Sequence, residues 1–249
     1  MTNTLTGKTA LVTGATAGIG YAIALQFAAE GAEVIVHGRN AERGAKTVRD
    51  IENAGGKARF IAADVSDAAD VRRLADEAGP VDVLVNNAGI YRFAPTFDTT
   101  DADFDDQLNT NLRAPYVLVQ KLVPGMIERG EGSVINVTTV AASTPAAGAG
   151  IYGASKAALD LLTRLWADEF GSQGVRVNAV APGPTQTLGT QAFESELIEG
   201  LGRTTALGRT AEADEIANVV TFVASPAASY VNGTILTVGG GAQAIRPAA

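Results

Sequence analysis

Cysteine is absent from this 249-residue sequence, and histidine occurs only once, at His37. The lack of thiols excludes disulfide bonds and thiolate catalysis. Together with the single imidazole it also excludes a zinc site built from Cys and His ligands, and we expect no metal. Basic residues are few, with 19 Lys and Arg against 27 Asp and Glu, which gives a net charge of −8. This balance argues against binding to nucleic acid or to an anionic membrane surface.

Long apolar runs are missing as well. No stretch reaches the roughly 18 residues that indicate a membrane span. The segment from Met1 to Gly7 lacks the basic and apolar regions of a signal peptide, so we expect a cytoplasmic protein. The composition is nevertheless globular, with 46% hydrophobic and 18% charged residues. The length suits one large α/β domain over residues 1–249.

Short β-branched runs alternate with longer helical patterns along the whole chain. This alternation predicts an α/β fold with a doubly wound parallel sheet of about seven strands and helices on both faces. Ligands of such sheets bind beyond the carboxyl ends of the strands. The predicted strands are Ala10–Thr13, Val34–His37, Ala58–Ala62, Val81–Asn86, Ser133–Thr138, Arg176–Ala181 and Ile235–Val238, and the predicted helices are Ile19–Glu30, Glu42–Asn53, Asp67–Ala78, Asp103–Arg129 and Tyr152–Phe170.

A glycine-rich turn follows the first predicted strand and leads into a helix. A helix N-terminus offers free N–H groups and the positive end of its dipole to a pyrophosphate. Gly14 permits the turn, Gly18 lets the backbone approach a phosphate, and Gly20 allows close packing of helix and strand. A tight turn without a ligand is the alternative. The candidate dinucleotide-binding residues in this turn are Gly14, Thr16, Gly18, Ile19 and Gly20.

The end of the second predicted strand indicates which dinucleotide binds. NAD enzymes usually place a carboxylate there, whereas this strand ends in His37-Gly38-Arg39-Asn40. Gly38 leaves room for a 2′-phosphate, and the Arg39 guanidinium can bind it through two hydrogen bonds. The sequence therefore favours NADP(H) over NAD(H). A solvated loop arginine is the alternative for Arg39, and His37 is interpreted as a strand-end residue with no ligand role.

Tyr152 and Lys156 lie four residues apart at the start of a predicted helix, so their side chains share one face. A phenol has a pKa of about 10, and a neighbouring ammonium group lowers it toward the range useful for general acid/base catalysis. Thr139, at the end of the fifth predicted strand, brings a hydroxyl group toward the same place. Such a pair also arises on helices by chance, and a threonine in a strand is common.

Asn111 lies in the long predicted helix, four residues before Pro115. Because proline has no N–H, the Asn111 carbonyl loses its usual partner and the helix should bend there. The freed carbonyl could hold a water that relays protons toward Lys156. The alternative is a kink that only serves packing.

With these residues assembled, the whole chain resembles the short-chain dehydrogenase/reductase family, which has a Rossmann-like fold. The resemblance rests on Thr13–Gly20, Asp64-Val65, Asn86-Asn87-Ala88-Gly89, Asn111-Leu112, Tyr152-x-x-x-Lys156, Pro182-Gly183 and Gly239–Gly241. It implies catalytic roles for Asn111, Thr139, Tyr152 and Lys156, with Lys156 also holding the nicotinamide ribose. It further implies cofactor contacts at Asp64, Val65, Asn87, Ala88, Gly89, Pro182, Gly183, Thr185 and Thr187.

The family usually has serine where this chain has Thr139, whose extra methyl group should narrow the pocket but keep the hydroxyl donor. The resemblance implies hydride transfer between NADP(H) and a carbonyl or secondary alcohol, with a 3-oxoacyl thioester, a small ketone or a sugar as substrate. It also implies a homotetramer. Residues near 188–207 suit an amphipathic substrate lid or ordinary packing, and Tyr91 and Phe93 are candidates for the pocket wall. A non-enzymatic NADP-binding scaffold, a sugar dehydrogenase and a nucleotide-sugar epimerase are the alternatives.

Overall fold

In the computed structural model, which describes residues 3–187 and 200–241, the core is a sheet of seven parallel strands. Their order across the sheet is β3-β2-β1-β4-β5-β6-β9, so the chain builds one half outward from β1 and the other half outward from β4. The prediction of a parallel sheet of about seven strands is confirmed. The strands are β1 (Thr9–Val12), β2 (Glu33–Gly38), β3 (Lys57–Ala62), β4 (Val83–Asn86), β5 (Gly132–Val137), β6 (Val175–Pro182) and β9 (Ile235–Val238).

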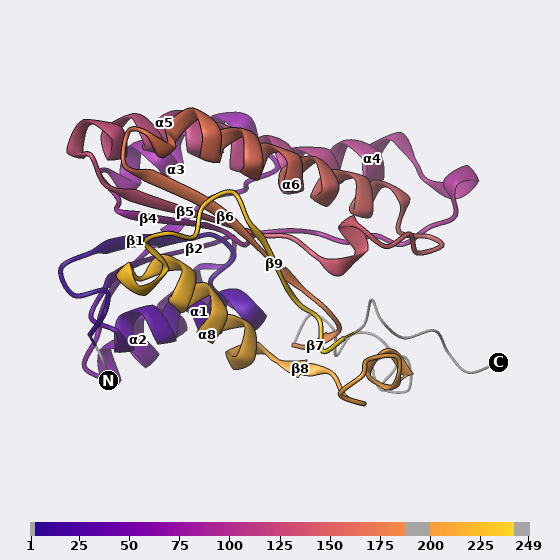
Figure 1. Ribbon diagram of the computed structural model, residues 1–249. Helices are drawn as coiled ribbons and strands as arrows, with labels where there is room; N and C mark the ends of the chain where they lie inside the picture. The colour runs from indigo at the N-terminus through magenta and orange to yellow at the C-terminus, as the bar shows by residue number, and fades with distance from the viewer. Residues whose placement is uncertain (1–2, 188–199, 242–249) are drawn as a thin grey trace.

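Helices cover both faces of this sheet (Figure 1). On one face lie α1 (Gly18–Ala29), α2 (Ala41–Asn53) and α8 (Ala213–Ala224). On the other lie α3 (Ala68–Ala78), α5 (Ala114–Arg129) and α6 (Gly150–Gly171), with α4 (Asp101–Leu108) leading into α5. Because both faces are covered, the strands read as continuous apolar runs rather than as an alternating pattern.

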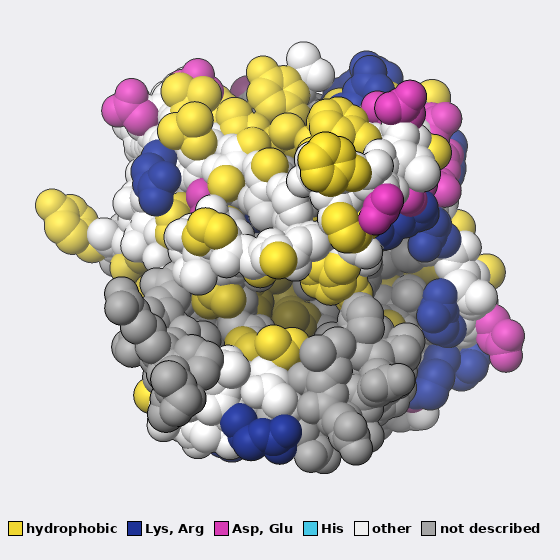
Figure 2. Space-filling view, turned by 90° about the vertical axis from the view of Figure 1, so that its right-hand side faces the viewer, with side chains coloured by type: hydrophobic (Ala, Val, Ile, Leu, Met, Phe, Trp, Pro, Cys, Tyr) yellow, Lys and Arg dark blue, Asp and Glu magenta, His cyan; other side chains and the backbone are white. Residues whose placement is uncertain are grey.

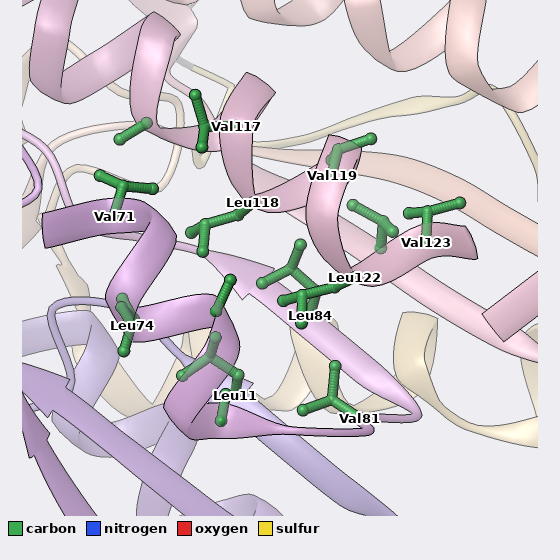
Figure 3. Close-up of a cluster of buried hydrophobic side chains, with 14 of the residues drawn as sticks. Leu11, Val71, Leu74, Val81, Leu84, Val117, Leu118, Val119, Leu122 and Val123 are labelled. Carbon is green, nitrogen blue, oxygen red and sulfur yellow. The ribbon is translucent and has the colours of Figure 1, made fainter. Parts of the chain in front are cut away.

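Two apolar clusters, one on each face of the sheet, form the core. Figure 3 shows part of the first, in which Leu11 of β1 and Leu84 of β4 meet Leu74 of α3 and Leu118 of α5. All four side chains are at most 1% exposed. The second cluster packs α1 and α8 against the opposite face of the same strands. Alternate residues of each central strand thus bury their side chains on opposite faces.

The predicted helix Asp103–Arg129 is not a single α-helix. Its first part is α4, and a π-helical turn over Asn109–Arg113 separates this from α5. The Ala114 N–H donates to the Asn109 carbonyl, five residues back, which is the π-helical pattern. The irregularity lies immediately before Pro115, where the sequence predicts a bend, because proline cannot continue the α-helical ladder.

Besides several one-turn 3-10 helices, the sequence analysis did not predict helix α8 or two short strands. Helix α8 is amphipathic, and a reciprocal capping box between Glu212 and Glu215 closes its N-terminus. The two short strands are β7 (Thr185–Gln186) and β8 (Ala211–Glu212), which pair in a small second sheet. Among the described residues, the helices include none with the length and apolarity needed to cross a bilayer.

Candidate active site

A cavity of about 670 Å³ lies beyond the carboxyl ends of β1, β4, β5 and β6. Here the winding of the sheet reverses between β1 and β4, which is where ligands bind in doubly wound folds. Figure 2 looks onto this end of the molecule and shows a hollow whose visible side chains are mostly hydrophobic. The volume is within the range of small-molecule sites. Most of the predicted site residues line this cavity.

The glycine-rich turn forms one side of the cavity. Gly14 and Gly18 adopt φ angles of 66° and 56°, which side-chain-bearing residues rarely adopt. At Gly20 an added Cβ would lie 2.3 Å from the Gly14 carbonyl oxygen, so helix α1 can approach the turn only with glycine here. The first turn of α1 holds no acidic residue, and no side chain caps its start at Ala17. The positive end of this helix therefore faces the cavity uncompensated, as an anion site requires.

Neighbouring segments hold the glycine-rich turn in place. The Thr13 hydroxyl accepts hydrogen bonds from the N–H groups of Asn87 and Ala88, at 2.9 and 3.0 Å. The Asn87 amide donates to the Thr13 carbonyl at 2.9 Å. On the other side, the Gly14 N–H donates to His37 Nδ1 at 3.1 Å. The turn after β4 and the end of β2 thus fix the shape of the loop.

His37 does more than end a strand. Its Nδ1 accepts from Gly14, so Nε2 carries the proton and donates to the Ala63 carbonyl, 3.1 Å away. The ring is 2% exposed. Burial lowers the pKa of His37 to about 4, which keeps the ring neutral at physiological pH. His37 thereby connects the glycine-rich turn, β2 and the end of β3. The sequence alone did not indicate this structural role.

A second group of predicted residues lies outside this cavity, around the end of β2. A Cβ at Gly38 would lie 2.5 Å from the Thr16 methyl group, so the loop packs directly on this glycine. Arg39 and Asp64 form an exposed ion pair at 4.0 Å, and neither side chain is buried. Val65, by contrast, is buried in the core, so its side chain serves packing. Thr16, in the glycine-rich turn, thus packs on Gly38, the residue before Arg39.

Tyr152 projects from the first turn of α6 into the cavity, opposite Thr139 at the end of β5. The Thr139 side chain lies near the Tyr152 hydroxyl. Burial raises the pKa of Tyr152, while the nearby Thr139 hydroxyl acts to lower it. Thr139 also accepts a hydrogen bond from the Ala141 N–H at 3.3 Å, which orients its hydroxyl. The two hydroxyl groups therefore converge on one point of the cavity.

Lys156 is buried below Tyr152, one helical turn along α6. Its ammonium donates to the Val137 carbonyl at 2.8 Å. Burial lowers the pKa of Lys156 to about 8, and the nearby Asp160 carboxylate partly opposes that effect. A Cβ on Gly89 would lie 3.3 Å from the Lys156 ammonium nitrogen, which would be a tight contact, so the chain passes close to Lys156 here.

Asn111 lies in the π-helical turn, and its side chain forms hydrogen bonds with groups other than Lys156. Its amide oxygen accepts from the Ile90 N–H at 2.9 Å, and its amide nitrogen donates to the Ile90 carbonyl at 2.8 Å. A further hydrogen bond at 3.2 Å reaches the Ser155 hydroxyl. The side chain thus holds the segment after Gly89 against α6, while Pro115 deprives the Asn111 carbonyl of its helical partner.

The segment held by Asn111 carries two aromatic rings into the cavity. The ring centroids of Tyr91 and Phe93 lie 6.1 and 6.0 Å from that of Tyr152, both in an edge-to-face arrangement. Gln107 accepts from the Arg92 N–H at 3.2 Å, and the Ala94 N–H donates to the Gly148 carbonyl at 2.9 Å. The sequence analysis predicted both rings at the pocket wall. It gave no indication of the hydrogen bond from Arg92 to Gln107 or of the one from Ala94 to Gly148.

The remaining predicted residues follow β6. Gly183 donates its N–H to the Val238 carbonyl at 3.0 Å, and a Cβ there would lie 2.7 Å from Gly239. The Thr185 hydroxyl donates to the Gly183 carbonyl, and Thr187 lies against Gly18. Pro182, Gly183, Thr185 and Thr187 all line the cavity. Of the expected lid at 188–207, residues 188–199 lie outside the described residues, whereas Leu201 and Thr204 line the cavity.

Comparison with known proteins gives matches along nearly the whole chain. The family model described as "Enoyl-(Acyl carrier protein) reductase" matches residues 14–243. Gluconate 5-dehydrogenase of Gluconobacter oxydans is 37% identical over 95% of this chain and 95% of its own. The 3-oxoacyl-[acyl-carrier-protein] reductase FabG of Thermotoga maritima is 37% identical over 95% of this chain and 98% of its own.

Solved structures agree with these matches. A protein described as a short chain dehydrogenase/reductase family protein is 49% identical and superposes with a TM-score of 0.91, covering 97% of this chain and 100% of its own. A short chain dehydrogenase from Burkholderia cenocepacia, solved in complex with NADP, is 39% identical with a TM-score of 0.89, covering 96% of this chain and 99% of its own. Both likenesses extend across the glycine-rich turn, β5 and α6.

Proposed function

The chain belongs to the short-chain dehydrogenase/reductase family of oxidoreductases, and we propose that it moves a hydride between NADP(H) and a carbonyl or secondary alcohol, with Tyr152 as general acid and base. The observation that carries this proposal is the convergence of the Tyr152 and Thr139 hydroxyls at one point of the cavity, above the buried Lys156 ammonium. Those groups suit the stabilisation and protonation of one reacting oxygen.

Tyr152 and Thr139 both act on the substrate oxygen. In reduction, Tyr152 gives its proton to the carbonyl oxygen as that oxygen gains negative charge, and Thr139 donates a hydrogen bond to the same atom. In oxidation, Tyr152 accepts the proton from the alcohol. Burial raises the pKa of Tyr152. A positive charge on Lys156, one helical turn away on α6, would favour the phenolate form that oxidation requires. Positioned acid/base groups of this kind contribute about 10²–10⁴-fold to a rate.

Asn111 supports this arrangement in two ways. Its side chain fixes the segment after Gly89, which passes close to Lys156. Its backbone carbonyl, which Pro115 deprives of a helical partner, is available to a water that returns a proton toward Lys156. The proton lost by Tyr152 in reduction is replaced by this route.

The glycine-rich turn has the features needed to hold NADP(H). Its glycines, two of which adopt positive φ angles, leave space at the N-terminus of α1, with no acidic side chain in the first helical turn to repel a pyrophosphate. Arg39, beside Thr16 and Gly38, would bind the 2′-phosphate of the adenosine, and Lys156 and Thr187 would bind the nicotinamide ribose and carboxamide. When bound, the cofactor supplies or accepts the hydride. The relative from B. cenocepacia is described with NADP, which supports the choice of dinucleotide.

A cofactor titration tests this proposal. We expect NADPH to bind more tightly than NADH, because Arg39 is paired only with an exposed carboxylate at 4.0 Å and can turn to a phosphate. Arg39→Ala should weaken NADPH binding by about tenfold or more, the effect of one lost charge-assisted pair, and leave NADH binding unchanged. Binding is measured by fluorescence of the bound nicotinamide.

Turnover is measured next, as NADPH consumption with ketones and 3-oxoacyl thioesters. Tyr152→Phe should abolish consumption while cofactor binding persists. NADPH binding without consumption of any carbonyl compound would favour the non-enzymatic scaffold instead. Preference for NADH would contradict the role of Arg39. A nucleotide-sugar epimerase would regenerate its cofactor and show no net consumption.

The proposal also covers the cellular location, the partners and the oligomeric state of the enzyme. We place the enzyme in the cytoplasm, as one catalytic domain over residues 1–249, without a nucleic-acid or membrane partner. The net charge of −8 supports the last two points. We propose a homotetramer, supported by large apolar side chains on the outer face of the α4–α6 layer: Phe104, Tyr116, Leu161 and Leu165 are each more than 40% exposed.

A further inference from the structure

Tyr152 lies in the first turn of α6, and the local sequence gives this turn little stability of its own. Ala149, the residue before the helix, forms no side-chain cap. A Ser, Thr, Asn or Asp at that position would accept a hydrogen bond from the free N–H groups of the turn. Gly150 and Gly153 take two of the first four helical positions, and glycine is a poor helix former. Contacts from outside the helix must therefore hold Tyr152 in place.

Ser155, three residues after Tyr152, connects this turn to a neighbouring element. Its hydroxyl donates to the Tyr152 carbonyl at 2.8 Å and accepts from the Asn111 amide nitrogen at 3.2 Å. The side chains of Ser155 and Asn111 are buried, at 1% and 0% exposure, so bulk water does not compete for these hydrogen bonds. Because a hydroxyl group has one proton, the donor of Ser155 is committed to the backbone of the turn that carries Tyr152.

The Asn111 side chain at the other end of this contact is fixed as well. Its amide oxygen accepts from the Ile90 N–H at 2.9 Å, and its amide nitrogen donates to the Ile90 carbonyl at 2.8 Å. With the bond to Ser155, both protons of the Asn111 amide group have an acceptor. A continuous series of hydrogen bonds thus runs from Ile90 through Asn111 and Ser155 to the backbone of Tyr152, and it joins the segment after β4, the π-helical turn and α6.

We propose that Ser155 is a positioning residue for the reaction: through its hydroxyl, Asn111 holds the first turn of α6, and with it Tyr152, in place against the substrate oxygen. The proposal rests on the function proposed above and deepens it. The side chain that holds this turn and the backbone carbonyl that returns the proton belong to the same residue, Asn111. A shift between Asn111 and α6 therefore disturbs both the acid/base group and its proton supply, and a misplacement of about 1 Å can cost on the order of 10²-fold in rate.

Thr163 of the same helix provides a matched control. Its hydroxyl donates to the Leu159 carbonyl and accepts from the Asn136 amide nitrogen, both at 2.8 Å. Thr163 and Asn136 are fully buried, and neither lines the cavity. Ser155→Ala and Thr163→Val each delete one buried hydroxyl group and leave one asparagine N–H without its acceptor. Both variants should therefore lose unfolding free energy to a similar extent, which urea denaturation measures.

Steady-state kinetics separates positioning from stability. We expect Ser155→Ala to lower kcat for NADPH-dependent ketone reduction by about tenfold and to leave KM and the Kd of NADPH within about twofold, because Tyr152 acts in the transition state. Thr163→Val should leave kcat unchanged. Ser155→Cys, whose thiol is a weaker donor and acceptor, should lie between wild type and Ser155→Ala. Unchanged kcat in Ser155→Ala, or equal losses in Ser155→Ala and Thr163→Val, would overturn the proposal.

Hydrogen exchange tests the same contact without turnover. The amides of residues 153–156 donate to the first carbonyls of α6, and they should exchange about tenfold faster in Ser155→Ala than in wild type. Thr163→Val should speed exchange later in the helix instead. Unchanged exchange over residues 153–156 in Ser155→Ala would contradict the proposal even if activity fell. Failure of the proposed function looks different: wild type would bind NADPH and reduce no ketone, while the difference in exchange would persist.

Discussion

Thr139 differs from the serine usual in the family, and the structure shows what the extra methyl group leaves unchanged. Its hydroxyl still lies near the Tyr152 hydroxyl, and it still accepts from the Ala141 N–H at 3.3 Å. As a β-branched residue, threonine has fewer χ1 rotamers than serine, so its hydroxyl is held more firmly. Because Thr139 lines the cavity, its methyl group takes space there.

Substitution at position 139 separates these two roles. Thr139→Ala removes a hydrogen bond to an oxygen that becomes charged in the transition state, and we expect kcat/KM to fall roughly a hundredfold. Thr139→Ser keeps the hydroxyl and should retain most of the activity, with a gain for substrates that are bulkier next to the carbonyl. The measurement is steady-state kinetics of both variants with a small ketone, acetone, and a bulkier one, methyl 4-acetylbenzoate. Unchanged kcat/KM in Thr139→Ala would remove Thr139 from the mechanism.

At the scale of elements, the strands were predictable and several details of the site were not. β-Branched apolar runs placed β2 and β5 to within one residue, because buried parallel strands leave a clear composition signal. Helix α8 was missed although its apolar periodicity and capping box are visible in the sequence. The π-helical turn was not predictable as such. Pro115 indicates a break, but the hydrogen bonds from Asn111 to Ile90 that accompany it depend on tertiary contacts.

The contacts of His37 are another feature that the sequence alone could not show. Both hydrogen-bond partners of His37, the Gly14 N–H and the Ala63 carbonyl, are backbone groups distant from it in the sequence. The neutral ring joins the glycine-rich turn to β2 and to the end of β3. Its pKa is lowered from 6.5 to about 4 in the folded protein, so the unfolded chain binds a proton between those values and the folded one does not. Its contribution to stability is therefore complete above pH 6.5 and is lost as the pH falls from 6.5 to 4.

Unfolding by urea at two pH values measures this effect. Between pH 7.5 and pH 5, His37 should cost the wild-type protein about 2 kcal/mol of unfolding free energy. His37→Asn keeps an acceptor toward Gly14 but cannot titrate, so that part of the loss should disappear, although the variant is less stable at pH 7.5. Carboxylates contribute equally to both proteins and cancel. The same pH-dependent loss in wild type and variant would show that His37 is not the titrating group.

At the scale of the whole molecule, the cavity and the exposed apolar side chains lie in different parts of the structure. The glycine-rich turn and α1 on one side and β5 with α6 on the other bring their polar groups to the same edge, where the winding reverses. The large apolar side chains exposed on the α4–α6 layer, Phe104, Tyr116, Leu161 and Leu165, do not line the cavity. Helix α6 thus presents Tyr152 and Lys156 from its first turns and the exposed side chains of Leu161 and Leu165 further along.

That surface yields a prediction for assembly. Leu161 and Leu165 are 65% and 46% exposed on α6, next to Tyr116 of α5, whose ring lies 5.8 Å from that of Trp166. Exposed leucines at a spacing of four lie on one face of the helix, and a second copy of the chain would cover them. Leu161→Lys with Leu165→Glu should convert the tetramer to smaller species in analytical ultracentrifugation, whereas Phe97→Lys, at a fully exposed site outside this layer, should not. Loss of activity together with assembly would follow if packing between copies holds α6, and with it Tyr152, in position. A monomeric wild-type protein, or a tetramer that survives the double substitution, would mean that this face is not the interface.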